Sequence, residues 1–121
     1  MGLFDDVEDK FKELQDGSYV VKVEGFSREQ TIHGAKPIMW QLRLMSNDQG
    51  QLPLKFSHIE NNAGFHILMR ELKDLGYGKP ANSQEFEAII HSLVGCLLEI
   101  QLTTTNKEEG YRDIKFLRKL S

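Results

Sequence analysis

The sequence predicts an α+β domain that is mainly β, and three observations support this. Five segments alternate apolar and polar side chains, as half-buried strands do. Two segments between the third and fourth of these repeat apolar residues at helical spacing. The length of 121 residues suits one hydrophobic core, so we expect a single domain over residues 1–121.

The first elements are an acidic helix and three strands. The helix is expected over residues 1–16, because Phe4, Val7, Phe11 and Leu14 recur at helical spacing before Asp16-Gly17. The three strands are expected over 18–27, 38–46 and 52–59, separated by a polar loop over 28–37 and a turn over 47–50.

The second half of the chain adds two helices and two strands. Helices are expected over about 61–75 and 83–94, each starting at asparagine or serine and ending before Gly76 and at Gly95. The last strands are expected over 96–104 and 111–120, with NKEEG as the hairpin connection.

This order is that of an oligonucleotide/oligosaccharide-binding (OB) barrel. We therefore predict a five-stranded OB-like barrel over 18–121, with an N-terminal helix and a helical insertion between strands 3 and 4. A five-stranded α+β sheet of another topology fits the same pattern and stays an alternative.

Composition and charge narrow the function classes. Apolar residues make up 40% and charged residues 27%, as in a globular protein. The net charge is −3, but residues 1–16 hold six acids and two lysines, so the remaining chain carries +1. Residues 111–121 hold four bases and one acid. Because local charge sets the potential of a groove, a basic last strand is compatible with a phosphate ligand.

Catalytic and targeting patterns are missing from the sequence. The four histidines lie on different predicted elements without metal-ligand spacing, and Cys96 has no second cysteine. No nucleophile elbow, phosphate loop or dinucleotide fingerprint occurs. We expect neither an enzyme nor a bound cofactor or metal. The acidic N-terminus and the lack of a long apolar run predict a cytoplasmic protein without membrane attachment.

The alternating strands predict which side chains face the core and which face outward. The predicted inner set is Tyr19, Val21, Val23, Ile38, Trp40, Leu42, Leu44, Leu54, Phe56, Ile114 and Phe116. The predicted outer set is Lys22, Phe26, Met39, Gln41, Arg43, Met45, Lys55, Ser57, Tyr111 and Lys115. The outer set mixes cations with flat and polarizable groups, which is what single-stranded nucleic acid requires, although a plain solvated face uses the same alternation.

The candidate nucleic-acid-binding residues come from this face, the loop over 28–37 and the last strand. They are Lys22, Phe26, Arg28, Lys36, Trp40, Arg43, Lys55, Tyr111, Arg112 and Lys115. Trp40 belongs to the predicted inner set, because a lone tryptophan in an alternating strand is more often part of the core, and it becomes a stacking platform if the register slips by one residue.

A family resemblance points the same way. The segments DGSYVVKVEGF, GAKPIMWQLRL, FHILMRELKDLG, LVGCLLEIQL and YRDIKFL, in this order, resemble small phage-encoded single-stranded DNA-binding proteins of the replication and recombination cluster. The resemblance covers about residues 14–117 and implies the OB fold and the ligand class only. Bacterial single-strand binders typically end in an acidic, Phe-terminated tail, whereas this chain ends in RKLS.

Two rival functions remain. The apolar stripe of residues 1–16, together with Met39 and Met45, also suits a protein-interaction or dimerisation module without a nucleic-acid ligand, for example a homodimer or a docking site for a replication or recombination protein. A hydrolase or nuclease accessory is the second rival. The sequence does not distinguish DNA from RNA.

Overall fold

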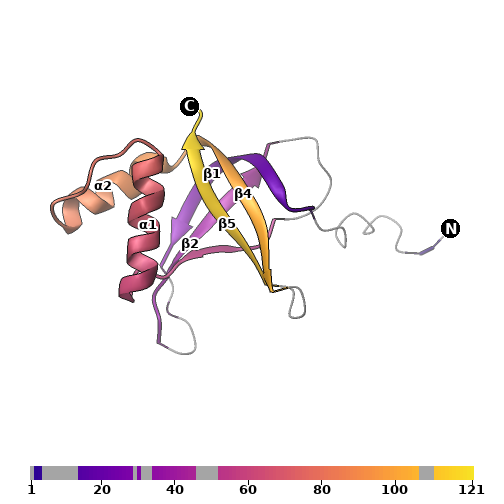
Figure 1. Ribbon diagram of the computed structural model, residues 1–121, viewed down its shortest axis with the longest axis horizontal. Coiled ribbons are helices and arrows are strands. Elements are labelled where there is room, and N and C mark those ends of the chain that lie inside the picture. Colours follow the sequence, from indigo (N-terminus) through magenta and orange to yellow (C-terminus); the bar gives the residue numbers. More distant parts are fainter. Residues whose placement is uncertain (1, 4–13, 29, 31–33, 46–51, 107–110) are drawn as a thin grey trace.

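A computed structural model describes residues 2–3, 14–28, 30, 34–45, 52–106 and 111–121. The elements of this part, in chain order, are β1 (Gly17–Ser27), β2 (Ile38–Leu44), β3 (Lys55–Ser57), α1 (Asn62–Asp74), α2 (Ser83–Leu93), β4 (Leu97–Asn106) and β5 (Tyr111–Lys119). The strands form one antiparallel sheet in the order β3-β2-β1-β4-β5 (Figure 1). The mainly β, α+β class predicted from the sequence is confirmed.

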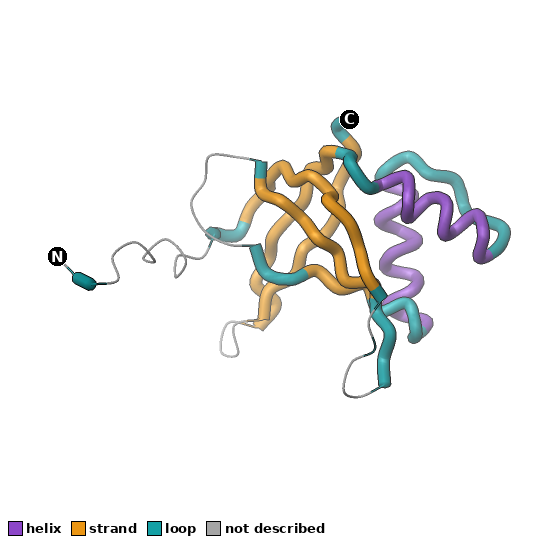
Figure 2. The backbone as a smooth tube through the Cα atoms, turned by 180° about the vertical axis from the view of Figure 1, so that it is seen from behind, coloured by secondary structure: helices purple, strands orange, loops and turns teal. Residues whose placement is uncertain are grey.

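Both helices begin where the sequence predicts, because asparagine side chains cap them. Asn61 accepts a hydrogen bond from the Gly64 N–H at 2.6 Å, and Asn82 accepts one from the Glu85 N–H at 2.9 Å. Such caps satisfy backbone donors that have no partner within the helix. The two helices lie together at one side of the curved sheet (Figure 2).

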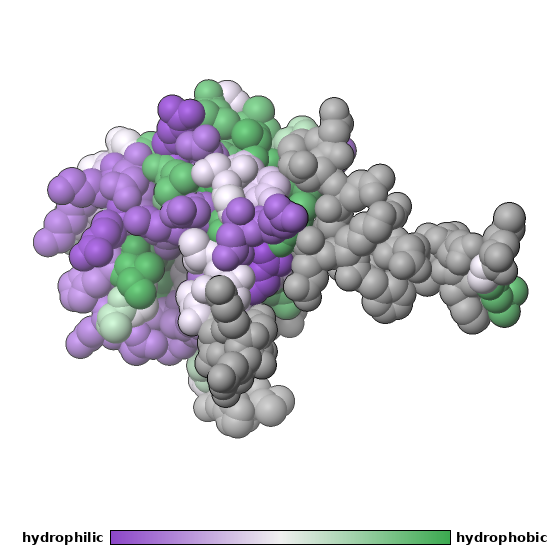
Figure 3. Space-filling model, turned by 45° about the vertical axis from the view of Figure 1, so that its right-hand side comes forward, coloured by the Kyte–Doolittle hydropathy of each residue, from purple (hydrophilic) through white to green (hydrophobic). Residues whose placement is uncertain are grey.

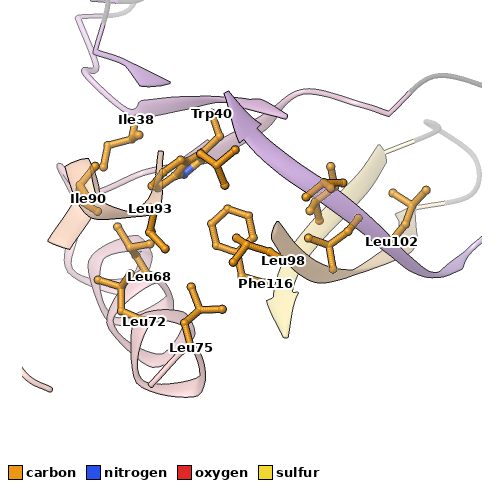
Figure 4. Packing of buried hydrophobic residues seen from close by; sticks show 14 of the residues in the cluster. Ile38, Trp40, Leu68, Leu72, Leu75, Ile90, Leu93, Leu98, Leu102 and Phe116 are labelled. Carbon is orange, nitrogen blue, oxygen red and sulfur yellow. The ribbon is translucent and has the colours of Figure 1, made fainter. Parts of the chain in front are cut away.

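The core lies between the inner face of the sheet and the helices. Trp40 of β2 meets Phe116 of β5 edge to face, with ring centroids 5.3 Å apart, although β2 and β5 are not neighbours in the sheet. The sheet therefore curls around its inner face. Leucine and isoleucine side chains of both helices point toward these two rings (Figure 4). The fully or nearly fully buried members contributed by the helices are Leu68, Leu72, Leu75, Ile90 and Leu93.

A buried ion pair ties the two edge strands together. The Nζ of Lys55 in β3 lies 3.0 Å from Oε2 of Glu71 in α1, with the side chains 6% and 3% exposed. Lys55 donates to the Ile114 carbonyl of β5 at 2.6 Å, and the Phe116 N–H donates to Glu71 at 2.8 Å. Two backbone groups on the free edge of β5 are thus satisfied by side chains, which buried backbone polar groups require.

The predicted facing of β3 was wrong. Leu54 and Phe56 were expected in the core but are 67% and 40% exposed, whereas Lys55 and Ser57 were expected outside and are buried. The physical reason is that both polar side chains find partners inside. Lys55 pairs with Glu71, and the Ser57 hydroxyl accepts a hydrogen bond from the Trp40 indole at 2.9 Å.

Phe26 also lies on the other face from the one predicted. The register of β1 with β2 shifts between Val23 and Gly25, which is a β-bulge. A bulge adds one residue to one strand and reverses the alternation beyond it. Phe26 therefore stands opposite Trp40 on the inner face, and its ring also contacts His91 of α2 with centroids 5.1 Å apart.

The chain enters β1 through a short anchored segment. Leu14 is buried in the core, and Asp16 accepts hydrogen bonds from the Thr104 N–H at 3.0 Å and hydroxyl at 2.9 Å. These two residues lie outside any helix. Residues 4–13 of the helix predicted over 1–16 lie outside the described residues, as does the predicted turn over 47–50.

Candidate nucleic-acid interface

Two cations stand side by side on the outer face of the sheet. Lys22 of β1 is the register partner of Arg43 of β2, and both side chains are exposed. Side chains at directly opposed positions have Cβ atoms about 5 Å apart, and like charges there destabilise the sheet. Within the described residues neither cation forms an ion pair. This position therefore concentrates positive charge without compensating it.

The aromatic pair of Phe56 and His58 begins on β3, and Phe56 lies on the same outer face. Met39 of β2 is the register partner of Phe56 of β3, so the two side chains share a face. The Phe56 ring stacks on the His58 ring, with centroids 6.1 Å apart and an interplanar angle of 26°. Phe56 is 40% exposed, so part of this ring is open to solvent.

The outer side chains of β2 connect the cations to the aromatic pair. Met39, Gln41 and Arg43 alternate along one face, and four residues of strand cover about 13 Å. A shallow hollow of about 310 Å³ lies beside them, lined by Glu24, Met39, Trp40, Gln41, Leu42, Leu52, Pro53 and Leu54. We name the set Lys22, Met39, Gln41, Arg43 and Phe56 the cation–aromatic face.

The loop between β1 and β2 contributes two further cations, Arg28 and Lys36. Arg28 donates to the Lys36 carbonyl, from Nε at 3.0 Å and from a terminal nitrogen, and this closes the loop at its base. Lys36 is exposed. Arg28 is therefore positioned by the backbone of its own loop.

The basic last strand is largely engaged with the protein itself. Arg112 donates to the Leu14 carbonyl and lies 3.1 Å from Asp16, which leaves its side chain 11% exposed. Arg118 pairs with Glu99 at 3.0 Å, and Lys119 lies over the Tyr77 ring. The excess charge predicted for residues 111–121 is therefore partly neutralised in the fold.

Tyr111 and Lys115 are exposed on the outer face of β5. Lys115 stands opposite Gln101 of β4, and β4 and β1 separate it from β2. Neighbouring strands lie about 4.8 Å apart, so three steps across the sheet exceed about 14 Å. These two residues are not part of the cation–aromatic face.

The ten predicted residues thus divide into groups. Lys22 and Arg43 come together, and Arg28 and Lys36 lie on the neighbouring loop. Tyr111 and Lys115 lie apart on β5, while Arg112 anchors the N-terminal segment. Lys55 and Phe26 face inward and not onto the outer surface predicted for them, whereas Trp40 is buried on the inner face, as the alternation of its strand predicts.

The Asp16 anchor has an electrostatic signature. Hydrogen bonds from the Thr104 hydroxyl and N–H, followed by the charge of Arg112, hold the pKa of the Asp16 carboxyl below its ordinary value. Donors that bond a carboxylate favour its charged form. The segment before β1 is therefore held to the β4–β5 pair in the pH range in which Asp16 is ionised.

Sequence reasoning missed Phe56 and His58. In an alternating strand, Leu54 and Phe56 lie on one face while Lys55 and Ser57 lie on the other, and the sequence allows either face to be buried. Choosing the correct phase requires burying a lysine, which is rare unless the lysine is paired. Only the contact with Glu71, 16 residues further along the chain, makes that choice favourable.

Further findings concern the surface, metal binding, membrane spans and the comparisons. One side of the molecule is mainly hydrophilic with small hydrophobic patches (Figure 3). Among the described residues, no group of three His, Cys, Asp or Glu side chains is arranged to hold a metal ion, and no helix is long and apolar enough to cross a membrane. The sequence matches no protein-family model and no curated protein.

Proposed function

We propose that this protein binds single-stranded DNA on the cation–aromatic face, with little sequence preference. The observation that carries the proposal is the directly opposed pair of Lys22 and Arg43, which no described acidic side chain neutralises. Such a pair costs stability in the free protein. A phosphate placed between the two cations attracts both of them and offsets the repulsion between them.

The same face supplies a stacking surface at a suitable distance. The Phe56 ring, supported from one side by His58, offers a flat apolar surface to a base about 13 Å along β2 from the cations. Base–aromatic stacking contributes about 1–3 kcal/mol per base and tolerates any base. Gln41 lies between the two ends and has an amide to hydrogen-bond a base edge or a phosphate.

We infer that the sheet forms an OB-like barrel. Support comes from the strand order β3-β2-β1-β4-β5, from the two helices between β3 and β4, and from the Lys55–Glu71 bridge between the two edge strands. In OB folds the faces of strands 2 and 3, with the adjoining loops, hold oligonucleotides. Four of the five residues of the cation–aromatic face lie on β2 and β3, and Lys22 lies on the neighbouring β1.

The net charge of −3 fits this proposal because of where the acids stand. Residues 1–16 carry −4, and the remaining chain carries +1. The proposed role is to protect or present a strand, without chemistry. The resemblance to phage-encoded single-strand binders favours a role in phage replication or recombination in the host cytoplasm, and RNA is the closest competing ligand.

The experiment is a fluorescence-anisotropy titration of labelled oligo(dT) with the wild-type chain and two phenylalanine variants. Phe56→Ala should raise the dissociation constant about 5- to 150-fold, because it removes one stacked base. Phe65→Ala is the matched control, since Phe65 is similarly exposed, at 36%, but lies on α1. Equal affinities for Phe56→Ala and wild type would remove the stacking role.

A protein-interaction module is the second candidate, and the exposed side chains of β3 and its surroundings favour it. Leu54, Phe56 and Met45 are 67%, 40% and 44% exposed, and contiguous exposed apolar side chains mark protein-interaction sites. If oligo(dT) does not bind at low salt, this candidate replaces the first.

A further inference from the structure

A basic groove lies on the helical side of the molecule and shares no residue with the cation–aromatic face. It runs between α1 and the linker to α2 and has a volume of about 720 Å³. Its cations are Arg70 and Lys73 of α1 and Lys79 of the linker, all exposed. Its apolar lining includes Phe65, Met69 and Tyr77.

The chemistry of this groove suits apolar side chains better than nucleic-acid bases. The Tyr77 ring carries the Lys119 ammonium 5.5 Å above its centroid, and its hydroxyl bonds Ser92 at 3.1 Å. The Phe65 ring already contacts the rings of Phe86 and His66. The rings of Tyr77 and Phe65 are therefore partly covered. The flexible apolar side chain of Met69 lines the groove together with the cations, and grooves that bind amphipathic helices have this combination.

One segment of the chain has the complementary chemistry. Residues 1–13 hold five acids and two lysines, a charge of −3, against three cations around the groove. Their apolar residues Phe4, Val7 and Phe11 recur at helical spacing, and an amphipathic helix in a groove is anchored by residues at such intervals. The segment thus combines acidic with apolar groups, and the groove combines cationic with apolar ones.

We propose that residues 1–13 of one copy of this protein bind the basic groove of a second copy. The same-chain alternative fails on length. Asp16 is fixed to Thr104, whereas Lys119 beside the groove pairs with Leu98 at the far end of β4. Six residues of strand cover about 20 Å. If the stretch from Phe4 to Phe11 forms the helix that enters the groove, only residues 12 and 13 bridge from the buried Leu14, and an extended chain of that length covers about 10 Å, which is too short.

Exchange of the segment between two copies gives a symmetric dimer, since each copy offers one segment and one groove. The groove shares no residue with the cation–aromatic face, so a nucleic-acid titration and an association measurement report on different residues.

The test is sedimentation velocity of the full chain over a range of concentrations at low salt. The wild type should associate to a dimer. Lys73→Glu/Lys79→Glu in the groove and Asp5→Lys/Asp9→Lys in the segment should each weaken association at least about tenfold, because like charges then meet. Lys36→Glu/Lys115→Glu, which makes the same charge change elsewhere, should associate as the wild type does.

Mixing the two weakened variants decides the case. In the mixture, each reversed segment meets a reversed groove and each native segment meets a native groove, so a heterodimer should form with near-wild-type affinity. A wild type that stays monomeric, or a mixture that does not recover, overturns the proposal. A groove variant that dimerises normally but loses oligo(dT) affinity would also overturn it and assign the groove to nucleic acid.

Discussion

The buried pair of Lys55 and Glu71 offers the sharpest test of the fold. Lys55→Met keeps most of the apolar side-chain length and removes the charge, so Glu71 is left as a buried carboxylate with one hydrogen bond, from the Phe116 N–H. Removing one partner of a buried pair costs about 3–5 kcal/mol. The Ile114 carbonyl also loses its donor, at about 1–3 kcal/mol for an unsatisfied buried group, which overlaps with the first figure.

The expected loss for Lys55→Met is therefore about 4 kcal/mol in the free energy of unfolding, or about 15 °C in Tm for a domain of this size. Urea denaturation followed by tryptophan fluorescence measures it directly. Trp40 is the only tryptophan and is 2% exposed, so its emission reports opening of the core. Lys115→Met is the control at an exposed lysine and should change stability by less than about 0.5 kcal/mol.

A double-mutant cycle separates the ion pair from its surroundings. Glu71→Gln alone leaves Lys55 charged and buried, whereas Lys55→Met/Glu71→Gln leaves no buried charge at this point. The double variant should therefore be more stable than the sum of the single losses by about 2 kcal/mol. Additive losses, or a Lys55→Met loss no larger than that of Lys115→Met, would refute the assignment of this pair as the link between β3 and β5.

Three further predictions concern a helix start, a carboxylate and the interface. Gly64→Ala should lower stability by about 1–3 kcal/mol in urea denaturation, because a Cβ there would lie 2.1 Å from the His58 carbonyl oxygen; Gly78→Ala, with open space around it, should be neutral or gain up to about 1 kcal/mol. The pKa of Asp16 is lower in the folded than in the unfolded chain. The ionised carboxylate therefore contributes its full stability above the unfolded pKa, about 3.9, and this contribution is lost as pH falls through the folded pKa. The Tm difference between wild type and Asp16→Asn should accordingly shrink below about pH 4. An equal Tm difference at pH 7 and pH 2 would contradict that link. Glu24→Gln should tighten oligo(dT) binding in an anisotropy titration at low salt, because Glu24 lines the hollow beside the cation–aromatic face; weaker binding would place the strand elsewhere.

The sequence predicts much of the fold because its signals are local. Asn61 and Asn82 mark helix starts through caps that involve residues three positions away, and alternation marks the strands. Local signals do not determine how far a strand extends: the third was predicted over 52–59, but β3 covers only Lys55–Ser57.

The errors at the candidate site come from contacts that are distant in sequence. Lys55 is buried because Glu71 and Ile114 receive its charge and its hydrogen bond, and neither is visible in the alternation of β3. Phe26 turns inward because a bulge follows Val23, and the local pattern continues smoothly through that point. Lys22 and Arg43 were placed correctly on one outer face, since no irregularity intervenes between them.

The salt dependence of oligo(dT) binding tests the central proposal most directly. For single strands, log Kobs falls with log salt concentration by about 0.7 for each neutralised phosphate. Lys22 and Arg43 hold one phosphate between them in this proposal, so Lys22→Ala/Arg43→Ala should reduce the slope by about 0.7, whereas Arg70→Ala/Lys73→Ala should leave it unchanged. An unreduced slope in Lys22→Ala/Arg43→Ala, with binding otherwise intact, would contradict the assignment of the cation–aromatic face as the site for single-stranded DNA.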